Sequence, residues 1–168
     1  PAQRRKHLPA VIAAIMLAML AACSHFAPDE ADGSCSAFST FGDRGWRYFD
    51  TLTLAADSTA DSIRHGALIL NLRHSTAYPW RNIWLELSYP DGTDSSATMA
   101  RDTFDIVLAD RYGRWRGSGM GSSLQLSDTL HTRFAMRRGQ RVSLRHIMRT
   151  DTLPAIERAG LIFQAEQR

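Results

Sequence analysis

The histidines are the residues of this 168-residue chain best suited to metal binding or acid–base chemistry. Four of them lie beyond residue 44: His65, His74, His131 and His146. No two stand at an HxH or HxxxH spacing, so a zinc site would have to be assembled by the fold. His74 follows Arg73 at the end of an expected strand, and His146 alternates with apolar residues. We therefore interpret all four as structural histidines, and we expect neither a metal ion nor a cofactor.

The glycine-rich segment Gly117–Gly121 is a second candidate, since such segments can hold a phosphate or a nucleophile. It lacks the lysine of a phosphate-binding loop, and no helical pattern follows it. Ser118 does not match the Gly-x-Ser-x-Gly nucleophile elbow. The segment therefore predicts a β-bulge or a hairpin with positive φ angles.

Four aspartates offer a second metal chemistry. Asp91, Asp94, Asp102 and Asp105 together carry enough carboxylate oxygens for calcium. Their spacing matches no known calcium loop, so solvated loops are the interpretation that we prefer. Because the sequence shows no convergent catalytic set, we also predict that the protein is not an enzyme.

The tryptophans leave two interpretations open. Exposed rings on a β-sandwich can stack on sugars, whereas inward rings fill the core. Trp115 stands between Arg114 and Arg116 on a short expected strand, so its side chain would point away from both of theirs. Core packing is the expectation for all four tryptophans and a recognition surface is the alternative; they are Trp46, Trp80, Trp84 and Trp115.

The first 22 residues have the pattern of a secretory signal peptide. A basic start is followed by an apolar run, Leu8–Ala22, whose 15 residues are fewer than the roughly 20 that span a hydrocarbon core. The run ends in Leu-Ala-Ala before Cys23, which resembles a bacterial lipobox. We predict that Cys23 is lipidated and attaches the mature protein to a membrane; an ordinary signal peptide is the alternative.

Charge is unevenly distributed along the chain. The whole sequence has 20 Lys+Arg and 17 Asp+Glu, for a net charge of +3 and a pI near 9.3. Removing residues 1–22 takes away three basic residues and no acidic one, which leaves 17 of each in 146 residues. A neutral mature domain does not support nucleic-acid binding, and the arginines of Arg133–Arg149 alternate with apolar residues as on one face of a hairpin.

Small and polar residues dominate positions 24–42, which is typical of a tether. We predict a signal peptide over 1–22, a lipidated N-terminus and flexible tether over 23–44, and a β-sandwich domain over 45–168. If Cys23 carries a lipid, Cys35 has no partner in the chain, so no intramolecular disulfide is expected.

Alternation of apolar and polar residues predicts an all-β fold. Only Leu153–Ala159 has a helical pattern, and it is short. Many short strands with frequent turn signals predict an antiparallel, jelly-roll-like β-sandwich. The expected strands are 46–54, 68–73, 83–88, 103–109, 113–117, 123–127, 131–137, 140–149 and 160–165.

Three segments carry a resemblance to a known family. Residues 72–87 contain R-H-S-x-x-Y-P-x-x-N-I-W, residues 108–121 contain L-A-D-x-x-G-x-W-x-G, and the third segment is 147–162. In this order, and after a lipobox, they resemble the GldH family of gliding-motility lipoproteins over nearly the whole mature domain. The resemblance implies a cell-envelope lipoprotein needed for surface gliding in motile members, with relatives in non-motile bacteria. It implies no known catalytic residue.

Together these patterns predict a non-catalytic, lipid-anchored accessory of a motility- or secretion-associated envelope machine. Its expected partners are envelope proteins and the membrane, at the periplasmic face of the outer membrane, with surface exposure as an alternative. A carbohydrate- or peptidoglycan-binding module that uses the tryptophans is the alternative function. Polar and aromatic residues at strand ends and turns are the candidate contacts: Arg73, His74, Tyr78, Asn82, Asp110, Arg114 and Trp115.

Overall fold

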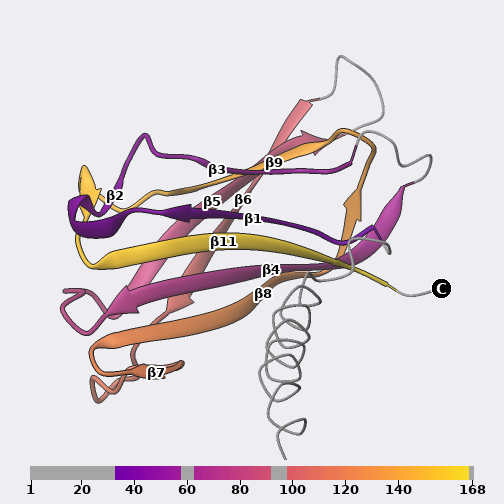
Figure 1. Ribbon diagram of the computed structural model, residues 1–168. Helices are drawn as coiled ribbons and strands as arrows, with labels where there is room; N and C mark the ends of the chain where they lie inside the picture. The colour runs from indigo at the N-terminus through magenta and orange to yellow at the C-terminus, as the bar shows by residue number, and fades with distance from the viewer. Residues whose placement is uncertain (1–32, 58–62, 92–97, 167–168) are drawn as a thin grey trace, which may run out of the picture. The chain divides into compact units, whose positions relative to one another are not determined.

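Two antiparallel β-sheets form the part of the chain that the computed structural model describes, residues 33–57, 63–91 and 98–166 (Figure 1). The first sheet has five strands, in the spatial order β1 (Cys35–Thr40), β11 (Ile156–Ala165), β4 (Arg64–Ser75), β8 (Ser123–Met136) and β7 (Ser118–Met120). The second has four, in the order β3 (Leu52–Ala55), β9 (Arg141–His146), β5 (Asn82–Asp91) and β6 (Thr98–Val107). A short ribbon pairs β2 (Trp46–Arg47) with β10 (Thr152–Leu153), and a 3₁₀ turn, η3 (Gly42–Arg44), precedes β2.

The order of the eight longer strands is that of a jelly roll. The chain alternates between the two sheets from β1 to β3, β4 and β5, and again from β6 to β8, β9 and β11. Among these eight strands, only β5 and β6 follow each other in the same sheet, as a hairpin. The prediction of an antiparallel, jelly-roll-like all-β fold is therefore confirmed.

The core lies between the inner faces of the sheets, where alternate side chains of facing strands meet. Leu68, Leu70 and Leu72 of β4 are completely buried, and so are Leu85 and Leu87 of β5. Burying each of these side chains stabilises the fold by roughly 1.5–3 kcal/mol. Because the period is two, the residues that alternate with buried Ile83, Leu85 and Leu87 point outward, and this places Trp84 on the outer face.

Trp46 closes one end of this core. It is completely buried and stacks on Phe41 with ring centroids 5.0 Å apart. Its indole N–H donates a hydrogen bond to the backbone carbonyl of Asp50 at 2.8 Å, which satisfies its one polar group. Core packing is thus the correct interpretation for this tryptophan.

The sandwich begins earlier than the predicted boundary at residue 45. Residues 35–40, assigned by composition to the tether, form edge strand β1, which pairs with β11 over six consecutive residues. Small side chains such as Ser36 and Ala37 resemble a linker in composition, but the ladder to β11 determines their structure. The predicted signal peptide and Cys23 lie outside the described residues.

The helical interpretation of Leu153–Ala159 is wrong. Leu153 ends β10 and Ile156 begins β11, with a tight turn between them in which Ala155 has a φ of 59°. Leu153 and Ile156 are both completely buried, so the turn reproduces the three-residue apolar spacing that suggested a helix. The backbone N–H of Ser75 donates to the carbonyl of Ala155 and fixes the turn to β4.

Several predicted strands have different bounds. The expected strand 113–117 is a loop in which only Trp115 makes an isolated bridge, to Ala109. The two strands expected over 123–127 and 131–137 are one strand, β8, with irregular pairing to β4. The prediction for the glycine-rich segment is confirmed, because β7 and β8 form a hairpin flanked by positive φ angles at Gly117 and Gly121.

Candidate functional site

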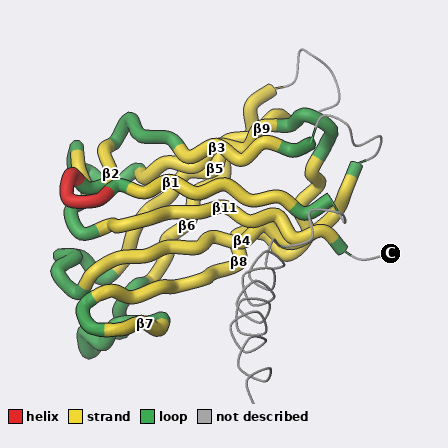
Figure 2. The backbone as a smooth tube through the Cα atoms, viewed as in Figure 1, coloured by secondary structure: helices red, strands yellow, loops and turns green. Residues whose placement is uncertain are grey.

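Three loops meet at one end of the sandwich, opposite the end where β1 begins and β11 finishes (Figures 1 and 2). They are the β4–β5 loop (76–81), the β6–β7 loop (108–117) and the β9–β10 loop (147–151). The carbonyl of Arg81 accepts hydrogen bonds from the backbone N–H groups of Leu108 and Ala109 at 2.8 and 2.9 Å, and these bonds join the first two loops. The N–H of Ile147 donates to the carbonyl of Trp84, which joins the third loop to β5.

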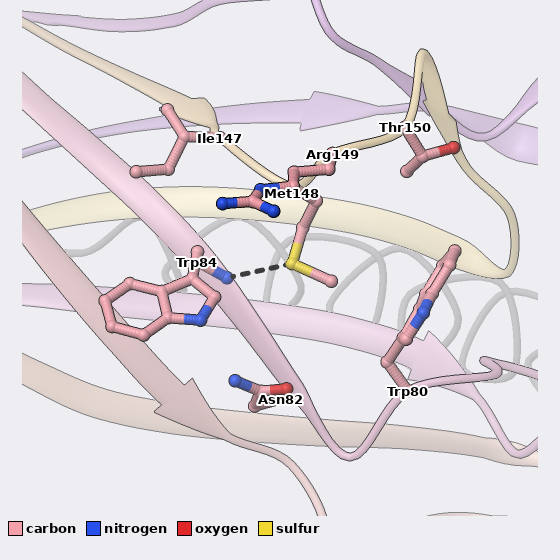
Figure 3. A pocket seen from close by; sticks show the side chains of 7 residues that line it. All are labelled: Trp80, Asn82, Trp84, Ile147, Met148, Arg149 and Thr150. Carbon is pink, nitrogen blue, oxygen red and sulfur yellow. Dashed lines mark hydrogen bonds between the residues drawn. The ribbon is translucent and has the colours of Figure 1, made fainter.

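An open groove of about 570 Å³ lies at this end, which we call the aromatic groove (Figure 3). Trp84, with 42% of its surface exposed, lines one part of it, and Trp80 lines another. The backbone N–H of Trp84 donates a hydrogen bond to the sulfur of Met148 at 3.4 Å, which holds the methionine between the two indoles. The groove is lined by Trp80, Asn82, Trp84, Ile147, Met148, Arg149 and Thr150.

Asn82 is fixed at the edge of the groove by its neighbours on both sides. Its side-chain amide donates a hydrogen bond to the carboxylate of Asp105 on the adjacent strand β6. Its backbone carbonyl accepts a hydrogen bond from the hydroxyl of Tyr78 at 3.2 Å. The amide group of Asn82 is therefore oriented before any ligand arrives.

Beneath the groove, three packed rings support the β4–β5 loop; we call His74, Tyr78 and Trp115 the aromatic latch. The ring of His74 lies 4.9 Å from that of Trp115 and 6.1 Å from that of Tyr78. Tyr78 in turn contacts Trp80 edge-on at 5.4 Å, so the latch bears directly on the groove. His74 is completely buried, and its Nδ1 donates to the carbonyl of Ser75 at 3.0 Å. Burial raises the pKa of the Tyr78 hydroxyl, which keeps that hydroxyl protonated as a donor.

Asp110 orders the neighbouring β6–β7 loop. Its carboxylate accepts hydrogen bonds from the backbone N–H groups of Tyr112 and Arg114 at 2.8 and 3.0 Å, and from the Arg114 guanidinium at 2.9 Å. These hydrogen bonds, above all the one from the Arg114 backbone, lower the pKa of Asp110, and the charge of Arg81 adds to the effect. The ordered turn places the ring of Trp115 against that of His74.

Of the seven predicted contact residues, the structure brings four together. His74, Tyr78 and Trp115 form the latch, and Asn82 lines the groove above it. Asp110 and Arg114 occupy the adjoining loop. Arg73 lies apart, because it points to the outer face of the five-stranded sheet, where its guanidinium pairs with Glu157 at 2.9 Å.

The sequence did not predict that the segment after β9 lines the groove. The predicted strand 140–149 ends at His146 instead, and Ile147, Met148 and Arg149 turn into the groove. The sequence held a signal for this ending: Ile147 and Met148 are consecutive apolar residues that break the alternation of β9. Trp46 is in the core, as expected, and Trp80 and Trp115 pack partly buried against it, whereas Trp84 is exposed. A recognition role for Trp84 stays a prediction.

A second polar cluster lies between the sheets at the side formed by β6 and β8; we call Tyr89, Asp102 and His131 the edge cluster. The carboxylate of Asp102 accepts hydrogen bonds from the Tyr89 hydroxyl at 2.8 Å and from His131 Nε2 at 2.9 Å. Burial, and then the neighbouring Asp102 carboxylate, raises the pKa of Tyr89 to about 12. Irregularities in the β4–β8 ladder flank the pair formed by Leu68 and His131, and such bulges redirect side chains.

The aspartates considered for calcium do not converge. Asp102 and Asp105 lie on strand β6 rather than in solvated loops. Asp102 pairs with inward-facing Leu87 and Asp105 pairs with outward-facing Trp84, so the two carboxylates lie on opposite faces of the sheet. Asp94 is outside the described residues. In the part of the chain that the structure describes, no group of three or more histidine, cysteine, aspartate or glutamate side chains is placed to hold a metal ion.

His146 is completely buried between the rings of Trp46 and Tyr48, whose centroids lie 5.6 and 5.8 Å from its own. Burial lowers its pKa, and backbone groups of Trp46 and Arg47 offset part of that effect. Neither ring nitrogen makes a hydrogen bond within standard distances among the described residues. The imidazole therefore acts as a neutral core side chain.

The fold and the site define a jelly-roll β-sandwich domain with a tryptophan-lined groove at its loop-bearing end. The model of the GldH lipoprotein family matches residues 34–162, which cover the described sandwich almost completely. The chain belongs to the GldH lipoprotein family, as the three sequence segments indicated. No helix in the described ranges is long and apolar enough to cross a membrane.

Comparisons with other proteins add little to this assignment. No curated protein matches the chain. Among solved structures, the CBM35 from Cellvibrio japonicus Abf62 is similar with a TM-score of 0.34 and 12% identity, covering 79% of this chain and 98% of that one. The Eiger TNF from S. frugiperda is similar with a TM-score of 0.33 and 11% identity, covering 81% and 96%. TM-scores of this size carry no information about a shared function.

Proposed function

We propose that the protein is a non-catalytic outer-membrane lipoprotein, anchored through Cys23 at the periplasmic face, that acts as an interaction component of a motility- or secretion-associated envelope machine. Membership of the GldH lipoprotein family supports the lipoprotein part of this proposal. The observation that carries the interaction part is the aromatic groove. It exposes Trp84 beside half-buried Met148 on a sheet face where polar side chains are the rule.

The composition of the groove is that of a protein-binding hot spot. Tryptophan, methionine and arginine are enriched at the centres of interfaces, and Trp84, Met148 and Arg149 adjoin one another here. The latch holds the groove in shape without a ligand, which reduces the entropy lost on binding. The chain enters the sandwich at Cys35, at the end opposite the groove.

Photo-crosslinking in the native host tests the interaction. p-Benzoylphenylalanine replaces Trp84 in one strain and Phe38 in another; Phe38 is a matched control, because it is 43% exposed and lies on the other sheet. We expect crosslinks from position 84 to one or a few envelope proteins, and not from position 38. Identical patterns from both positions, or no protein crosslinked at position 84, would contradict the proposal.

The anchor has a separate test. Replacing the lipidated cysteine (Cys23→Ser) removes the thiol that would carry the acyl chains, and we expect the protein to appear in the soluble periplasmic fraction. Cys35→Ser is the matched control, and it should leave the protein with the membranes. Continued membrane association of Cys23→Ser would show that the anchor lies elsewhere.

Carbohydrate binding is the second candidate function, and one observation favours it. Two tryptophans, Trp80 and Trp84, line the same open groove together with the amide of Asn82, and indoles and amides are groups that contact sugars. Titration with peptidoglycan fragments, followed by tryptophan fluorescence, separates the candidates. A saturable change that Trp84→Ala abolishes would favour glycan binding over a protein partner.

A further inference from the structure

We infer that the aromatic groove takes a large apolar side chain from an acidic segment of its partner protein. The inference rests on the proposed function, and it adds the chemistry of the partner. Two features of the groove carry it: the relative orientation of its rings, and the charge of the loops that surround it.

The shape of the groove suits a single inserted side chain better than a flat ligand. In Figure 3 the indole of Trp84 is seen face-on and that of Trp80 edge-on, so the two rings do not form one platform. Met148 lies between them, held by its contact with the Trp84 backbone. Methionine adapts to many apolar shapes, and it contacts aromatic rings favourably. An aromatic or aliphatic side chain can therefore enter the groove and rest against the thioether and the indole of Trp84.

The loops that build the groove and the latch are positively charged, although the mature chain as a whole is neutral. Segments 76–81, 108–117 and 147–151 hold five arginines and two aspartates. One of these aspartates, Asp110, is engaged by Arg114 at 2.9 Å. The charged residues of these loops are Arg81, Asp110, Arg111, Arg114, Arg116, Arg149 and Asp151. A segment rich in aspartate or glutamate would be attracted to these loops.

Arg149 connects the two features, because it is exposed and lines the groove itself. Its guanidinium can bind a carboxylate with two parallel hydrogen bonds, a geometry that lysine cannot provide. Arg81 stands between the groove residues Trp80 and Asn82 in the chain and is exposed. An apolar side chain in the groove would therefore lie beside Arg149, which favours an acidic neighbour on the partner.

Fluorescence anisotropy with three labelled pentapeptides tests this chemistry on the mature lipoprotein in detergent. The probes are Glu-Glu-Phe-Glu-Glu, Lys-Lys-Phe-Lys-Lys and Glu-Glu-Ala-Glu-Glu. We expect the first to bind at least fivefold more tightly than either of the others, and its affinity to fall as salt is raised. Equal or tighter binding of the lysine peptide, or equal binding of the alanine peptide, would overturn the inference.

Three substitutions locate the effect. Arg149→Glu should remove the preference for the acidic peptide. Arg101→Glu should keep it, because this substitution changes the charge by the same amount on a strand of the same four-stranded sheet, away from the groove. Trp84→Ala should weaken binding of Glu-Glu-Phe-Glu-Glu about tenfold. Loss of the preference in Arg101→Glu, or its persistence in Arg149→Glu, would contradict the assignment to this groove. An alginate hexamer bound more tightly than the acidic peptide would assign the groove to an anionic glycan instead.

The outcomes distinguish this inference from the function on which it rests. If position 84 crosslinks to envelope proteins but the peptides show no charge preference, the interaction function stands and the acidic partner does not. If no protein is crosslinked at position 84, the function itself fails.

Discussion

The aromatic latch and the edge cluster each combine a tyrosine with a histidine, but they use them in different ways. In the latch, Tyr78 and His74 are buried and donate to backbone carbonyls, so their hydrogen bonds position a loop. In the edge cluster, Tyr89 and His131 share the carboxylate of Asp102, which joins strands of the two sheets. The latch therefore supports the groove, whereas the edge cluster holds the sheets together.

Deleting the latch tyrosine should have the largest effect. Tyr78→Ala removes a buried ring, and we expect the free energy of unfolding to fall by about 3–5 kcal/mol, as for other aromatic truncations in cores. Because Tyr78 contacts Trp80, crosslinking from position 84 should fall as well. Urea denaturation and the crosslinking assay measure the two effects.

Tyr78→Phe is the matched control for this change. It keeps the ring and loses only the hydrogen bond to the carbonyl of Asn82, so we expect a loss of about 1 kcal/mol. If Tyr78→Ala were no more destabilising than Tyr78→Phe, the ring would not be a structural support. Unchanged crosslinking in a folded Tyr78→Ala protein would separate the latch from the groove.

The edge cluster should respond at a smaller scale, and without any effect on the groove. Asp102→Ala leaves the Tyr89 hydroxyl and His131 Nε2 without their common acceptor, and we expect a loss of about 1–2 kcal/mol, since the site is partly open to solvent. Asp102→Asn retains one acceptor and should cost less. Stability is read from urea denaturation, and crosslinking from position 84 should remain. Loss of crosslinking in a folded Asp102→Ala protein would break the comparison.

His146 adds a pH dependence of stability to this comparison. Its pKa is lowered in the folded state by burial, so the unfolded chain takes up a proton first as the pH falls. Stability should therefore decrease as the pH drops below about 6.5, the ordinary histidine value, and level off below the folded pKa. Each unit by which the pKa is lowered corresponds to about 1.4 kcal/mol.

Urea midpoints measured from pH 8 to pH 5 check this expectation. His146→Leu should remove the part of the acid sensitivity that comes from this residue, because leucine fills the site and does not titrate. His65→Gln, at an exposed position at the start of β4, is the control and should retain that sensitivity. An unchanged pH dependence in His146→Leu would show that another group is responsible.

Patterns of period two predicted the sheets well, because burial alternates along β4 and β5 in the same way as the residue types. β1 escaped prediction because its side chains are small, and its structure depends on the ladder to β11 rather than on its own hydrophobicity. Phe38 is the exception, and its ring lies over Gly160 of β11, where a larger residue would collide. Such pairing between distant segments is not visible in a single sequence.

One part of the candidate site could be predicted from local sequence, and the other part depends on pairing between distant strands. Tyr78 and Asn82 belong to a short loop with recognisable turn residues, so their position at a strand end followed from local sequence. Met148 and Arg149 join them only because β9 pairs with β5, more than fifty residues away in the chain. The sequence alone could have predicted that the side chains of Asp102 and Asp105 point to opposite faces of the sheet, since residues three apart on one strand face opposite sides.

Arg73→Ala should have the smallest effect, and it sharpens the boundary of the site. Arg73 is the one predicted contact residue that faces the outer surface of the five-stranded sheet, where its side chain is 50% exposed and pairs with Glu157. Exposed ion pairs contribute about 0–1 kcal/mol, so we expect little loss of stability and unchanged crosslinking from position 84. Thermal unfolding and the crosslinking assay measure both, with Asn82→Ala as the comparison inside the groove. Reduced crosslinking in Arg73→Ala would mean that the partner also contacts the outer face of β4, and that the site extends beyond the aromatic groove.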